Sequence, residues 1–182
     1  MTSPLTYAEI SSTIEKVQQQ VIPAALVYTT HERWPLQPTR SLPKTPLHIS
    51  VLDSSFNPPT LAHLALANSS NPFPLTSDYD AKLLLLSVRN ADKTPHAGDA
   101  TLSQRAEMMC LLAARVHHSS CGSPPNVAVG LVNEPTFIAK SLALRKFFDD
   151  RLAELTSSPS PTHVQLTFLM GSSQCTPRIP LT

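Results

Sequence analysis

A threonine and a histidine stand three residues apart at the start of a predicted helix, directly after a proline-rich loop. They are Thr60 and His63, and the loop runs from Asp53 to Pro59. Residues at this spacing share one face of a helix, so both side chains would point at whatever the helix end holds. Free N–H groups and the helix dipole attract anions there, which predicts an anion site. Taken singly, Thr60 would be an ordinary N-cap and His63 an ordinary histidine.

The scarcity of glycine excludes the common phosphate-binding motifs. The chain has 18 prolines but only four glycines, which are widely separated. No G-x-G-x-x-G fingerprint, G-x-x-x-x-G-K-[ST] phosphate loop or G-x-S-x-G nucleophile elbow can be written anywhere in it. Any phosphate site must therefore use other groups.

Composition and charge exclude further classes of function. The net charge is +1 without a block of like charge, so binding of nucleic acid by a basic face is not indicated. The three cysteines form no C-x-x-C pair, which predicts neither a disulfide framework nor a metal site. With no signal peptide and no long apolar run, we expect a cytoplasmic and/or nuclear protein without a membrane partner. The sequence does not indicate an oligomeric state.

Strands alternate with helices over most of the chain. A capping box at Thr6 and Glu9 predicts a helix over 7–22, and the proline-rich stretch 23–46 is expected to be an extended arm on the surface. Apolar runs predict strands at 47–53, 82–88, 127–132 and 164–170, and helical patterns fall at 60–68, 102–117 and 136–155.

This alternation predicts an α/β fold, a Rossmann-like three-layer α/β/α arrangement around a parallel sheet of about four strands. We divide the chain into an N-terminal helix and arm (1–46), the α/β domain (47–171) and an irregular tail (172–182). Ligands of such sheets bind outside the carboxyl ends of the strands, where the predicted loop lies.

The segment SFNPPTLAH at 55–63 resembles the G-S-F-N-P-x-[HT]-x-G-H signature of the nucleotidyltransferase superfamily. Within it, the segment is most similar to the fungal branch of the nicotinamide mononucleotide adenylyltransferases. Ser54 and Ala62 stand where the signature has glycine. The segments around Lys93, Arg105 and Gly171 resemble later parts of the same pattern.

The resemblance implies a role for each matching residue. His63 and Thr60 would be catalytic, while Lys93 and Arg105 could equally be solvated side chains. The ATP-binding and phosphate-binding positions would be Ser55, Phe56, Asn57, Lys93, Arg105 and Gly171, and those on the mononucleotide side Thr136 and Phe137.

The activity implied by the resemblance is adenylyl transfer from ATP to nicotinamide mononucleotide, giving NAD and pyrophosphate. Mg²⁺ would be carried by the ATP phosphates. Two alternatives stay open: a nucleotide-binding or weakly ATP-hydrolysing protein without transferase activity, and a transferase of the pantetheine-phosphate or cytidylyl type. The resemblance does not distinguish nicotinamide mononucleotide from its acid form as the acceptor.

The end of the chain departs from the pattern. Ser172 and Ser173 follow Gly171 where the family has G-x-D, and the family's S-x-x-T-x-x-R segment is missing. The missing segments imply a truncated or alternatively spliced product, or an incomplete gene model, in which we expect the last strand of the sheet to be absent and transfer to be impaired.

Overall fold

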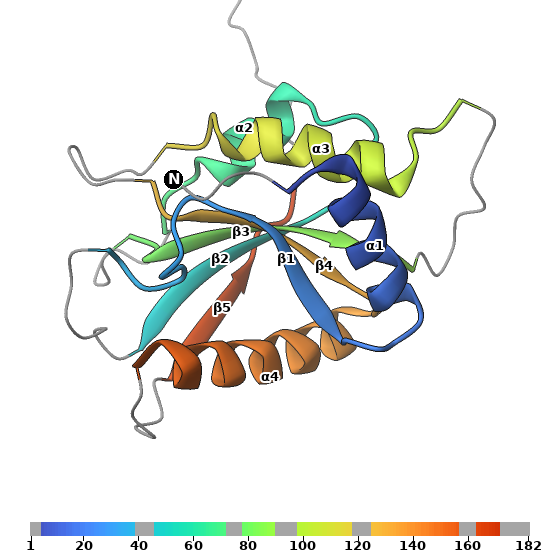
Figure 1. Cartoon of the computed structure of the whole chain (residues 1–182). Coiled ribbons are helices and arrows are strands. Elements are labelled where there is room, and N and C mark those ends of the chain that lie inside the picture. The colour runs from blue at the N-terminus through green and yellow to red at the C-terminus, as the bar shows by residue number, and fades with distance from the viewer. Residues whose placement is uncertain are drawn as a thin grey trace, which may run out of the picture.

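Five strands form one sheet, with helices on both of its faces, in the computed structural model of the chain (Figure 1). The structure describes residues 5–38, 46–71, 78–89, 98–117, 125–156 and 163–171. The elements in chain order are α1 (Tyr7–Gln18), β1 (Ala24–Thr29), β2 (Leu47–Asp53), α2 (Leu61–Ala67), β3 (Ala81–Ser87), α3 (Leu102–Ala113), β4 (Val127–Val132), α4 (Phe137–Thr156) and β5 (Val164–Phe168). None of the helices in these ranges is long and apolar enough to cross a membrane.

The strand order is β1-β4-β3-β2-β5. β2 pairs in parallel with β3 on one side and with β5 on the other, and β3 pairs in parallel with β4. The chain moves outward from β2 to β3 and β4, then crosses through α4 to β5 on the far side of β2. The strand order therefore reverses between β2 and β5, and a crevice for ligands is expected at their carboxyl ends.

The sheet corrects the expectation of about four parallel strands with the last one missing. The fifth strand is β1, which runs antiparallel along β4 with a register shift between Leu26 and Tyr28. Part of the predicted surface arm thus belongs to the sheet, and Trp34 from the same stretch is fully buried. The sequence pattern does not predict β1, because burial along this strand is irregular: the bulge removes the strict alternation of a regular strand.

The two faces of the sheet have separate cores. α1, α2 and α3 cover one face and α4 covers the other (Figure 1). Leu84 and Leu86 of β3 face the first group, whereas Leu83 and Leu85 face α4. Burial on both faces explains why the sequence of β3 is a continuous apolar run.

Several element boundaries differ from the predicted ones. Helix α1 ends at Gln18 rather than at residue 22, because Gln20 adopts a left-handed backbone with a φ of 59°. α3 ends at Ala113 instead of 117, and β5 ends at Phe168 instead of 170. Apolar residues continue past each end, so periodicity alone overestimates the lengths.

The buried indole of Trp34 provides a test of the packing beneath α4. Its ring centroid lies 5.6 Å from that of Phe148. We expect Trp34→Ala to lower the free energy of unfolding by about 3–5 kcal/mol, because it leaves a large cavity. Denaturant unfolding followed by circular dichroism measures this loss. The control Leu111→Ala removes a side chain that is 71% exposed and should cost no more than about 0.5 kcal/mol. Equal costs for the two variants would contradict the packing.

Candidate functional site

The loop after β2 is anchored by the ring of Phe56. This side chain is fully buried, and its backbone lies in the left-handed region with a φ of 45°. A non-glycine residue in that region costs about 1–3 kcal/mol, and such residues cluster at functional sites. The Phe56 ring centroid lies 4.9 Å from that of His63. The strained residue therefore supports the histidine directly.

The imidazole of His63 joins the beginning of the loop to its end. Its Nε2 lies 2.9 Å from Ser54 Oγ. Its Nδ1 accepts a hydrogen bond of 3.0 Å from the Thr60 backbone N–H and lies 2.8 Å from Thr60 Oγ1. A backbone N–H can only donate, so Nδ1 is the unprotonated nitrogen. In the neutral ring the proton is then on Nε2 and is donated to Ser54.

Thr60 and His63 contact each other instead of both pointing outward as the helical spacing suggested. α2 begins at Leu61, and the Thr60 N–H at its start is already bound to His63. The helix spans only Leu61–Ala67, which is less than two turns. Any anion at this loop would therefore meet the side chains of Ser54, Thr60 and His63 more than the helix end.

Asn57 connects the loop to the segment before α3. Its Nδ2 donates to Asp99 Oδ1 over 2.8 Å, and its Oδ1 accepts from the Ala100 N–H over 3.1 Å. Arg105 is buried, donates from Nε to the Ala100 carbonyl over 2.8 Å, and lies 3.9 Å from Asp99. Asn57 and Arg105 thus make contacts within the protein that hold the loop in place.

The start of α4 reaches the same end of the sheet from the other face. Lys140 Nζ donates to Asp53 Oδ2 over 2.6 Å, and both side chains are largely buried. The Phe137 ring packs edge-on against Phe168 at the end of β5, with centroids 5.5 Å apart. Thr136 accepts a hydrogen bond from the Ala139 N–H in the first turn. The two predicted mononucleotide-side residues therefore lie near the carboxyl ends of β2 and β5.

The remaining predicted site residues are placed as follows. Ser55 is half-buried within the loop, and Gly171 lies beside Leu66 of α2. Lys93 falls outside the described residues, as do Ser172 and Ser173. Sequence reasoning missed the contact of Ser54 with His63 and the pairing of Lys140 with Asp53. Ser54 could have been identified as a polar replacement of a signature glycine, whereas nothing in the sequence pairs Lys140 with Asp53.

Two mostly apolar cavities border the loop on the side of α3. Their volumes are about 890 and 680 Å³, and they share Pro58, Met108 and Leu111 in their walls. Within the described ranges, no group of three or more His, Cys, Asp or Glu side chains is placed to hold a metal ion.

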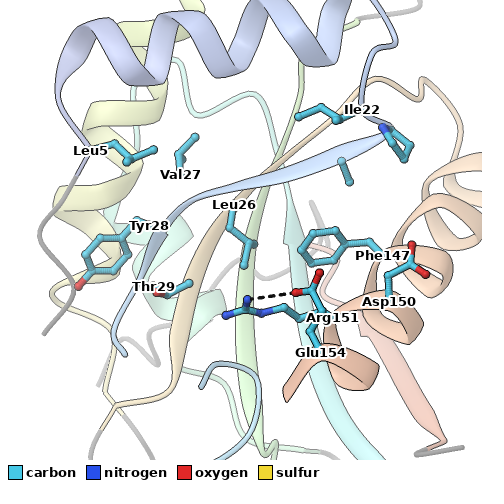
Figure 2. A pocket seen from close by; sticks show the side chains of 12 residues that line it. Leu5, Ile22, Leu26, Val27, Tyr28, Thr29, Phe147, Asp150, Arg151 and Glu154 are labelled. Carbon is cyan, nitrogen blue, oxygen red and sulfur yellow. Dashed lines mark ion pairs between the residues drawn. The ribbon is translucent and has the colours of Figure 1, made fainter. Parts of the chain in front are cut away.

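A third cavity, of about 500 Å³, follows the outer edge of β1 and includes residues of α4 (Figure 2). β4 and β3 separate β1 from β2, so this cavity is remote from the loop. Its arginine, Arg151, pairs with Glu154 and donates to the carbonyls of Glu32 and Trp34. We assign no ligand to it.

Comparison with known proteins supports the nucleotidyltransferase resemblance over half of the chain. A Schizosaccharomyces pombe protein named "Putative nicotinamide mononucleotide adenylyltransferase" is 38% identical over 92 residues, which are 50% of this chain and 31% of that protein. The match thus spans about a third of the relative's length. No family model and no solved structure matches the chain.

The protonation of His63 can be tested directly. Burial lowers the pKa of its imidazole from the ordinary 6.5. Because the unfolded chain then binds this proton more readily than the folded protein, His63 makes the free energy of unfolding fall as the pH drops below about 6.5. An NMR titration of the assigned imidazole should give a pKa below 6.5, with Nε2 protonated at neutral pH. A pKa at or above 6.5 would contradict the burial of the ring, and a proton on Nδ1 of the neutral ring would contradict the hydrogen-bonding scheme.

Proposed function

We propose that the protein is a nucleotidyltransferase that transfers the adenylyl group of ATP to nicotinamide mononucleotide, releasing pyrophosphate and forming NAD. The observation that carries the proposal is the imidazole of His63 held between Ser54 and Thr60. The cluster lies in a loop that resembles the superfamily signature and leaves the carboxyl end of β2. The similarity to the yeast protein supports the same reaction class.

The reaction needs no nucleophile from the protein. A phosphate oxygen of the mononucleotide attacks the α-phosphorus of ATP, and the bond to pyrophosphate breaks. Catalysis then depends on positioning and on hydrogen-bond donors directed at the developing negative charge. His63 suits this task, because its neutral ring has a donor at Nε2, which is bound to the Ser54 hydroxyl at the end of β2. Thr60 fixes this tautomer, since its N–H and its hydroxyl both donate to Nδ1.

The chemistry of the loop fits Mg²⁺ arriving on the nucleotide. The groups of the cluster are two hydroxyls and an imidazole, whereas the nearby carboxylates of Asp53 and Asp99 are bound to Lys140 and Asn57. Mg²⁺ keeps several waters and commonly binds substrate phosphates with few protein ligands. Mg²⁺ bound to the nucleotide would supply charge neutralisation, while the chain's own residues would orient the nucleotide.

Binding of ATP can be tested by thermal unfolding of the 182-residue chain with and without Mg-ATP. A ligand present at about a hundred times its Kd stabilises the native state by about 2.7 kcal/mol. For a domain of this size, that should raise Tm by roughly 5–10 °C. Mg²⁺ alone and Mg²⁺ with adenosine serve as controls, since neither supplies the triphosphate. An unchanged Tm at millimolar Mg-ATP would count against the phosphate site.

Adenylyl transfer can be tested by chromatographic detection of NAD formed from ATP and nicotinamide mononucleotide. We expect His63→Ala to reduce the rate by about 10²–10³-fold, because it removes the Nε2–H donor through which the cluster would stabilise charge on the transferring phosphate. The matched control is His163→Ala, at an exposed histidine just before β5, which should retain the wild-type rate. Full activity of His63→Ala would refute the mechanism.

The two open alternatives give different results in these experiments. A nucleotide-binding protein without transferase activity would show the ATP-dependent shift in Tm but form no dinucleotide. A transferase of the pantetheine-phosphate type would form no NAD but would release pyrophosphate from ATP when phosphopantetheine is present. One of the cytidylyl type would release pyrophosphate from CTP when a phosphorylated acceptor is present. A pyrophosphate assay with these substrates therefore separates the transferases from a protein that only binds the nucleotide.

A further inference from the structure

We infer that Ser54 is a phosphate-binding residue of this chain, whose hydroxyl extends the hydrogen-bond donor of His63 to an anionic oxygen of the ligand. The inference rests on the proposed function, because it takes the loop after β2 to be the phosphate site. The ligand class is a phosphate ester or polyphosphate.

The direction of the hydrogen bonds carries the first step. Nδ1 of His63 accepts from the Thr60 N–H, so the neutral ring has its proton on Nε2. Ser54 Oγ lies 2.9 Å from Nε2 and therefore accepts this proton in a hydrogen bond. A serine hydroxyl that accepts a bond still has its own O–H to donate. Within the part of the chain that the structure describes, no acceptor is found for it.

The placement of Ser54 carries the second step. Its backbone N–H donates to the Leu85 carbonyl of β3 over 3.3 Å, which fixes the residue at the end of the sheet. The residue is half-buried and its contact with His63 is only partly buried, so the hydroxyl is not sealed inside the core. The residue lies at the carboxyl end of β2, beside the point where the strand order reverses.

An anion bound by the Ser54 hydroxyl is held more strongly when that hydroxyl also accepts a hydrogen bond from His63. When an anion accepts from the Ser54 hydroxyl, the oxygen becomes a better acceptor for the His63 Nε2–H, so that the two bonds polarise each other. Ser54 stands where the signature described above has glycine, which offers no hydroxyl. The serine thus gives this chain a contact that the signature residue could not make.

The test measures the affinity of the full chain for inorganic tripolyphosphate by isothermal titration calorimetry. Ser54→Ala should weaken binding about tenfold, as expected for the loss of one hydrogen bond to a charged group. Ser54→Thr keeps a hydroxyl and should stay within about threefold of the wild type. The matched control is Ser103→Ala, which removes a half-buried hydroxyl paired with Ser11 over 2.9 Å between α3 and α1.

A second readout separates the hydroxyl from the state of the histidine. ¹⁵N NMR of the imidazole should show Nε2 protonated in both the wild type and Ser54→Ala, because the Thr60 N–H sets the tautomer. Unchanged or tighter binding of tripolyphosphate by Ser54→Ala would overturn the inference, and tighter binding would mean that Ser54 competes with the ligand for His63. Absence of tripolyphosphate binding by the wild type would overturn it as well. If the wild-type chain binds tripolyphosphate but forms no dinucleotide, the proposed transfer reaction is refuted while the phosphate contact of Ser54 is not.

Discussion

β2 is hydrogen-bonded to a parallel strand on each side and is covered by helices on both faces. Ile49 and Val51 point to the α4 core, while Leu52 points to the core beneath α1 and α3. A strand held in this way has a fixed register, because a shift by one residue would exchange its two faces. The position of the loop that follows Asp53 is therefore determined by the packing of the whole sheet.

The loop is also tied to helices on opposite faces of the sheet. Asp53 at its start binds Lys140 of α4, and Asn57 in its middle binds the segment that precedes α3. Removing one partner of a buried ion pair is costly, because the other charge is left uncompensated. These two connections and the buried Phe56 ring restrict the backbone conformation of the loop that carries Ser54 and Thr60.

The sequence predicts best those helices and strands whose pattern of buried residues is regular along the element itself. β3 was recognisable because burial on both faces produces a continuous apolar run, whereas β1 was missed because its bulge and flanking prolines remove any period. The motif identified the loop and its histidine, but not the direction of their side chains. That direction depends on hydrogen bonds between residues 54, 60 and 63, and on the pairing of Asp53 with a helix 87 residues away.

The tautomer of His63 also bears on the kind of catalysis that the cluster can support. A serine beside a histidine resembles the start of a nucleophilic dyad, in which the imidazole takes the proton of the hydroxyl. Here the nitrogen that faces Ser54 already carries a proton, since the Thr60 N–H occupies the other one. The ring can therefore donate toward Ser54 but cannot activate it as a base. This agrees with the proposed reaction, in which one substrate attacks the other directly and the protein would supply only hydrogen bonds.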